Sequence, residues 1–236
     1  MNSKKEVTKR FWSLVAPELA SVGFGRFSGN HVYRDRAATI DVIKLEFFTP
    51  TAHREWGTTP YSFGLSAGIY PGFAPNPFGG RIAVDAAGKA EPDENICAVR
   101  TRAIRRLRQP KHVPSSVWQI EAETANAALA LTDAQNALRT QFLPWFGKFS
   151  DPQALLDLFR SGEENFESVA PCFGFGRVGS PVRNLYLGFT ALNCGDEDLA
   201  KCALTAALSK GDFLALSGSS VVDDEIHDAL ARIDRE

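Results

Sequence analysis

Residues 61–70 read Tyr-Ser-Phe-Gly-Leu-Ser-Ala-Gly-Ile-Tyr, with apolar side chains at the odd positions and mostly small or polar residues at the even ones. This alternation predicts a β-strand with one apolar face. Upstream, the turn residues Ser28–Asn30 and Asp35–Arg36 separate further apolar segments and predict antiparallel pairing. Within residues 40–47 the apolar side chains change once from even to odd positions, as they would at a β-bulge. Residues 23–70 therefore predict two or three strands around which the rest of the chain is organised.

The segments that flank these strands have different patterns. Apolar residues recur at spacings of three and four from Val7 to Val22 and predict an amphipathic helix. Pro17 lies inside that helix, so we expect a kink or a break there. Residues 49–60 are expected to form a polar loop, and residues 71–80, with three prolines and three glycines, an irregular one.

The remaining two thirds of the chain are predicted to be mainly helical. Residues 97–107 predict another strand. Helices are expected, several with a capping residue and a proline at the start, over residues 121–142, 152–162, 181–193, 197–209 and 223–235. The sequence thus predicts an α+β fold, in which an N-terminal helix packs on a small antiparallel sheet that a long helix closes. We expect this domain over residues 1–165 and a C-terminal helical lobe over residues 166–236.

Charge is divided unevenly along the chain, although the formal net charge is only −2. Residues 1–118 carry 17 Lys+Arg and 10 Asp+Glu, whereas residues 119–236 carry 9 and 18. Such asymmetry marks an interaction surface or mutual neutralisation of the two halves. The charged N-terminus, the lack of a long apolar run, and four cysteines without C-x-x-C spacing predict a cytoplasmic protein with reduced thiols and no membrane segment.

An ordered series of motifs runs through the first two thirds of the chain: Phe11–Leu14, Gly23-Phe24, Val32–Arg34, Ile40–Leu45, Phe63–Tyr70, Cys97, Trp118 and Leu143–Phe146. This series resembles the bacterial family called domain of unknown function 4304 over roughly residues 7–160. The resemblance implies a shared scaffold and transfers no catalytic residue. Further on, Gly188, Ala191, Gly195, Asp196, Ala200 and Ala207 look like one tetratricopeptide-type helical hairpin. Arrays of such hairpins need about three repeats, so we expect a single capping hairpin.

Two short motifs match catalytic patterns but lack the required context. Gly64–Gly68 matches G-x-S-x-G, which needs a sharp strand-to-helix turn to expose its serine. Here the strand alternation continues through the motif. Gly174–Gly179 matches G-x-G-x-x-G, which needs a buried strand before it and another after the helix. The four histidines have no ligand spacing, and we expect neither a metal nor another cofactor.

A run of arginines is the feature that most suggests a function. On a strand, Arg100, Arg102, Arg106 and Arg108 would point to one side, spaced about 6–7 Å for each two residues. Guanidinium groups bind carboxylates and phosphates with two parallel hydrogen bonds. A solvated strand face, or pairing with the acidic second half of the chain, remains the alternative interpretation.

These observations favour a non-enzymatic protein-binding module whose arginines contact an acidic protein surface, such as an immunity protein that neutralises a bacterial toxin. A small-ligand protein or an enzyme is the first alternative, with a pocket between the sheet and the C-terminal lobe lined by Tyr61, Phe73, Phe78 and Trp118. A nucleic-acid binder that uses the arginines is the second. The isoelectric point of 6.1 and the lack of interleaved aromatic residues argue against nucleic acid.

Overall fold

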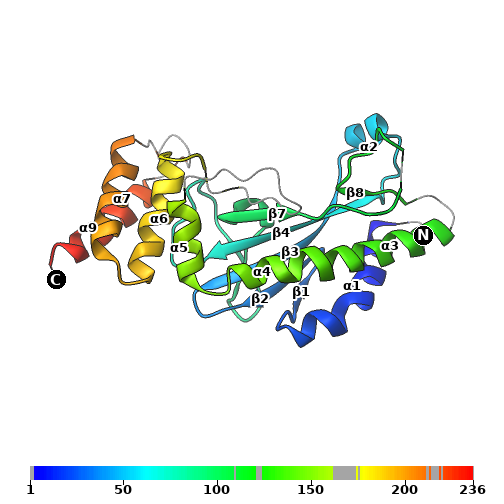
Figure 1. The fold of residues 1–236 in the computed structure, drawn as a ribbon, viewed down its shortest axis with the longest axis horizontal. Helices are drawn as coiled ribbons and strands as arrows, with labels where there is room; N and C mark the ends of the chain where they lie inside the picture. Colours follow the sequence, from blue (N-terminus) through cyan, green and yellow to red (C-terminus); the bar gives the residue numbers. More distant parts are fainter. Residues whose placement is uncertain are drawn as a thin grey trace.

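The computed structural model describes residues 3–108, 110–120, 124–161, 174, 176–210, 213, 218 and 220–235. These residues form an α+β fold, as predicted, with helices packed on an antiparallel sheet (Figure 1). The main sheet has the strand order β1-β2-β3-β4-β7, and β8 also pairs with β4. Its strands are β1 (Arg26–Ser28), β2 (His31–Asp35), β3 (Thr39–Phe47), β4 (Phe63–Pro71), β7 (Val99–Arg102) and β8 (Val117–Trp118).

The two central strands are buried on both of their faces. β3 and β4 pair without interruption along their whole length, so the predicted β-bulge is absent from these strands. The switch of apolar residues from even to odd positions has another cause. Ile43 and Leu45 enter the main core on one face of the sheet, whereas Val42 packs with Tyr33 and Tyr70 in a second cluster on the other. An apolar pattern alone does not separate a bulge from a strand with two buried faces.

The N-terminal helix α1 (Lys4–Ser21) lies across the core face of the sheet (Figure 1). The hydroxyl of Ser3 caps it by accepting from the backbone N–H of Glu6 at 3.2 Å. The prediction of a break at Pro17 is wrong, because the helix continues through it to Ser21. Pro17 and Ser13, whose carbonyl loses its partner, are both exposed, so water can bond that carbonyl. Gly23, with φ of 90°, follows the end of the helix in the left-handed conformation that glycine adopts readily.

The long helix is extended by an irregular turn. It comprises α3 (Thr124–Ala137), a π-helical turn η2 (Leu138–Phe142) and α4 (Leu143–Lys148). The sequence predicted a helix over residues 121–142, but the helical run continues through Pro144 to Lys148. Pro144 lies inside this continuous helical run, two residues after the π-helical turn, where the wider turn leaves room for the proline ring.

Regular structure is present in the predicted loop at residues 49–60 and in the segment between β4 and β7. Residues 49–60 hold the helix α2 (Pro50–Trp56), capped by the hydroxyl of Thr49 and ended by Gly57 with φ of 59°. Among its residues only His53 is buried, which explains the missing apolar pattern. The excursion before β7 contains the short strands β5 (Ala83–Val84) and β6 (Ala90–Glu91) and the 3-10 turn η1 (Glu94–Ile96).

The C-terminal helices gather at one end of the molecule, opposite α2 and β8 (Figure 1). They are α5 (Pro152–Arg160), α6 (Pro181–Asn193), α7 (Glu197–Lys210) and α9 (Val221–Ile233). The core is continuous across this end, because Phe159 of α5 and Tyr186 of α6 belong to the same buried cluster as the sheet. Within the described ranges, none of the helices is both long enough and apolar enough to cross a bilayer.

Candidate functional site

The four arginines do not share one strand face. β7 ends at Arg102, so Arg106 and Arg108 lie in the loop of residues 103–116 that leads to β8. Arg100 is half-buried, and a Cβ placed on Gly174 would lie 2.6 Å from its Nε. The expectation that all four point to one side is therefore wrong, because the strand is shorter than its polar-apolar pattern suggested.

Exposed cations nevertheless gather along this edge of the sheet. We use the name basic strip for Arg102, Arg106, Arg108 and Lys111, all of which are exposed. The strip follows the end of β7 and the loop beyond it, at the outer edge of the sheet (Figure 1). Its far end approaches α2, because a Cβ on Gly57 would lie 3.5 Å from His112 Nε2.

Gln141 holds the start of the loop to the long helix. Its Oε1 accepts from the backbone N–H of Ile104 at 2.8 Å, and its Nε2 donates to the backbone oxygen of Ile104 at 2.6 Å. The side chain is almost fully buried at 6% exposure. The amide thus replaces the backbone pairing that Ile104 loses beyond the strand.

Asp133 of α3 holds the middle of the loop. Its Oδ2 accepts from the backbone N–H groups of Arg106 and Leu107, at 3.0 and 3.4 Å, and from Trp118 Nε1 at 2.9 Å. Arg105 turns inward and donates to the backbone oxygens of Leu107 and Val113. Burial lowers the pKa of Arg105 from its ordinary value. The loop is therefore braced from inside while its other cations face solvent.

The basic strip is largely unneutralised by its surroundings. Arg102 Nη2 lies 3.7 Å from Glu46 Oε1, a long contact to a side chain in the same sheet. No side chain in the described part of the protein forms an ion pair with Arg106, Arg108 or Lys111. Among the described residues of the acidic second half, none pairs with these three cations.

A cluster of charged side chains lies near the basic strip, where η1 packs against the sheet. Lys44 Nζ lies 2.8 Å from both carboxylate oxygens of Asp93, and His31 Nε2 lies 3.2 Å from Oδ2. The hydrogen bonds from His31 and Lys44 hold the pKa of Asp93 well below its usual range. Close by, burial raises the pKa of Glu94. This cluster fixes η1 to β2 and β3.

Replacing Asp93 by Asn should flatten the acid side of the stability profile. Because the folded-state pKa of Asp93 is depressed, its contribution is present above the unfolded pKa of about 4 and is lost as the pH falls through the folded pKa. Urea unfolding from pH 7 to about pH 2 should therefore show a steeper loss below about pH 4 in the native chain than in Asp93→Asn. The exposed Glu55→Gln variant serves as the control. Parallel profiles for the native chain and Asp93→Asn would contradict the assignment.

The four aromatic residues predicted to line a pocket do not meet. Tyr61 precedes β4 and Phe73 follows it, and the nine residues of that strand span about 30 Å. Trp118 is fully buried and stacks on Phe63 with 5.7 Å between ring centroids. Phe78 is 47% exposed. Phe73 lines a cavity that is described below.

The G-x-S-x-G motif lies in the middle of a strand. Ser66 is fully buried in β4, opposite Lys44 on β3 and Arg102 on β7. Its hydroxyl has no hydrogen-bond partner among the described residues, so no base activates it there. Gly68 is required by packing, since a Cβ at this position would lie 2.6 Å from Cys97 Sγ.

The glycine-rich motif at 174–179 leads into α6 through Ser180, which caps that helix. Helix α7 follows, whereas a dinucleotide fold would need a strand. The segment directly before the motif, residues 169–173, where a dinucleotide fold would need a buried strand, lies outside the described residues. Within the described part of the chain, no group of three or more His, Cys, Asp or Glu side chains could hold a metal ion.

A cavity of about 530 Å³ lies between the end of β4 and α9. Its lining comes from residues 70–82, which leave the strand, and from the first turns of the helix. A pocket between the sheet and the C-terminal helices was one of the expectations from sequence. Of the residues that line this cavity, the sequence analysis named only Phe73. The others could not be predicted, because residues 70–82 and α9 are far apart in the sequence and come together only in the folded chain.

Comparison with protein-family models, with curated proteins and with solved structures finds no match for this chain. The resemblance to the domain of unknown function 4304 and the tetratricopeptide-like character of α6 and α7 therefore stay predictions.

Proposed function

We propose that the protein is a non-enzymatic binding module that contacts an acidic protein surface through the basic strip. The observation that carries this proposal is a braced loop whose outward cations lack ion pairs with the described residues. The buried Gln141 and the half-buried Asp133 hold the loop, so little conformational entropy is lost when a partner binds. Complementary charge would set the association rate and the choice of partner.

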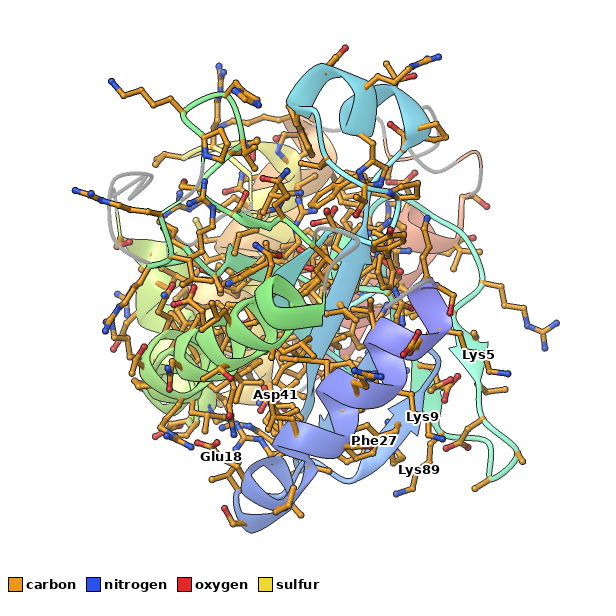
Figure 2. The ribbon with its side chains drawn as sticks, turned by 90° about the vertical axis from the view of Figure 1, so that its right-hand side faces the viewer. Lys5, Lys9, Glu18, Phe27, Asp41 and Lys89 are labelled. Atoms are coloured by element: carbon orange, nitrogen blue, oxygen red, sulfur yellow. The ribbon has the colours of Figure 1, made fainter. Side chains whose placement is uncertain are left out.

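Reversing the charge of the strip should weaken partner binding without unfolding the protein. The variant Arg102→Glu, Arg106→Glu, Arg108→Glu changes three exposed side chains. The matched control is Lys5→Glu, Lys9→Glu, Lys148→Glu, which makes the same charge change at exposed positions elsewhere; Figure 2 shows Lys5 and Lys9 on the outer face of α1. Affinity for the partner should fall about tenfold or more in the strip variant and change little in the control.

The measurement begins with capture from nuclease-treated host lysate at about 50 and 200 mM salt, because surface attraction weakens with ionic strength. Each captured protein is then purified and titrated against both variants. A partner that binds the strip variant and the control equally contradicts the proposal. A parallel capture omits the nuclease. If nucleic acid is then retained, and its affinity falls steeply as the salt concentration rises, the nucleic-acid alternative is favoured instead.

A further inference from the structure

The cavity between the end of β4 and α9 has fixed walls. Its volume of about 530 Å³ lies in the range of small-molecule sites. Asn76 orders the loop wall, because its Oδ1 accepts from the backbone N–H of Phe78 at 3.2 Å and its Nδ2 donates to the backbone oxygen of Gly79. The opposite wall is the regular helix α9. A ligand would therefore enter a site that is already formed.

Two opposite charges line the cavity without pairing. Arg81 comes from the loop and Glu225 from α9, and neither forms an ion pair with any side chain that the structure describes. They are also not within ion-pair distance of each other. Both side chains are reachable from solvent, and partial desolvation, with Asp228 nearby, raises the pKa of Glu225.

The rest of the lining is largely apolar. Phe73 and Ile82 are half-buried on the loop side, and Val221 of α9 is 54% exposed. Tyr70 lies at the end of β4 and is 8% exposed. An apolar molecular body could cover these side chains while its charged ends reach Arg81 and Glu225.

We propose that this cavity binds a small zwitterion with an apolar body, the chemistry of a short apolar peptide or a free apolar amino acid. The ligand's amine pairs with the carboxylate of Glu225, and its carboxylate pairs with the guanidinium of Arg81. The apolar body lies against Phe73 and Val221. The site is separate from the basic strip, so the proposal stands or falls independently of the protein partner.

The test removes one charge at a time, either from the ligand or from the cavity. Leucine, phenylalanine and the dipeptide phenylalanyl-leucine are titrated calorimetrically against the full chain, together with N-acetylated and C-amidated dipeptide. Each blocked form should bind the native chain about tenfold or more weakly than the free dipeptide. Glu225→Gln should lose the preference for a free amine only, and Arg81→Gln the preference for a free carboxylate only.

Control variants change the same types of charge outside the cavity. Asp224→Asn on α9 and Lys89→Gln near the loop should leave both preferences intact, since neither residue lines the cavity. Absence of saturable binding by all three zwitterions at about 10 mM would overturn the proposal. Equal binding of free and blocked dipeptide, or preferences unchanged in Glu225→Gln and Arg81→Gln, would overturn it as well.

Discussion

Replacing Asp41 by Ala is expected to lower the free energy of unfolding by about 3–5 kcal/mol, the usual cost of breaking a buried ion pair from one side. Asp41 is fully buried on the core face of β3. Its Oδ2 lies 2.7 Å from Arg34 Nε and 2.7 Å from Arg36 Nε. Removal of the carboxylate would leave two half-buried guanidinium groups without their counter-charge.

The two arginines also connect the sheet to the ends of two helices. Arg34 Nη1 donates to the backbone oxygen of Val22, just after α1, at 2.8 Å, and Arg36 Nη2 donates to that of Phe146 in α4 at 3.0 Å. The Val22 carbonyl lies where a helix leaves its last carbonyls without a partner in the next turn, whereas the Phe146 carbonyl also accepts from the backbone N–H of Phe149 at 3.3 Å. Figure 2 shows Asp41 between α1 and the green helices. Its loss should therefore loosen both helix ends.

Asp35 provides a matched control in the same hairpin. It pairs with Arg26 at 2.6 Å, but near the surface, where such pairs contribute about 0–1 kcal/mol. Urea unfolding of Asp41→Ala, Asp41→Asn and Asp35→Ala compares the three directly. Asp41→Asn keeps an acceptor oxygen and should lose less than Asp41→Ala. A loss in Asp41→Ala no larger than in Asp35→Ala would contradict the prediction.

Helices and strands were predicted well from the sequence where residues close together in the chain determine the structure. β4 was predicted because its odd positions enter the core and its neighbours follow turn residues. α5 and α6 were predicted because Asp151 and Ser180 cap their first turns, each followed by a proline. In each case the deciding residues lie within a few positions of each other.

Contacts between distant residues account for what the sequence did not predict. The basic strip depends on Gln141 and Asp133, which lie 37 and 27 residues from the groups that they bind. No local pattern relates these positions. The cavity likewise joins residues 70–82 to α9, which begins at Val221. The candidate sites could therefore be predicted in part by residue type, but not by geometry.

Replacing Arg183 by Ala is expected to destabilise the protein by about 3–5 kcal/mol, from lost hydrogen bonds and the cavity left behind. Arg183 opens α6 and is only 2% exposed. Its Nε donates to the backbone oxygen of Phe159 at 3.0 Å, and its Nη2 donates to those of Leu158 and Ser161. One buried guanidinium thus caps the C-terminal end of α5. Arg183→Lys, with a single ammonium group, should recover part of the loss.

Hydrogen exchange of Arg183→Ala will also test whether the C-terminal helices form a separate unit. Phe159 stacks on Tyr186 at 5.8 Å between ring centroids, in the same buried cluster as β4 and β7. Because this core is continuous, we expect one unfolding transition, with amides of α6 and of β3 and β4 losing protection together. Loss of protection confined to α6, α7 and α9 would contradict this expectation. It would instead support a lobe that unfolds by itself, with the boundary near residue 165 that the sequence predicted.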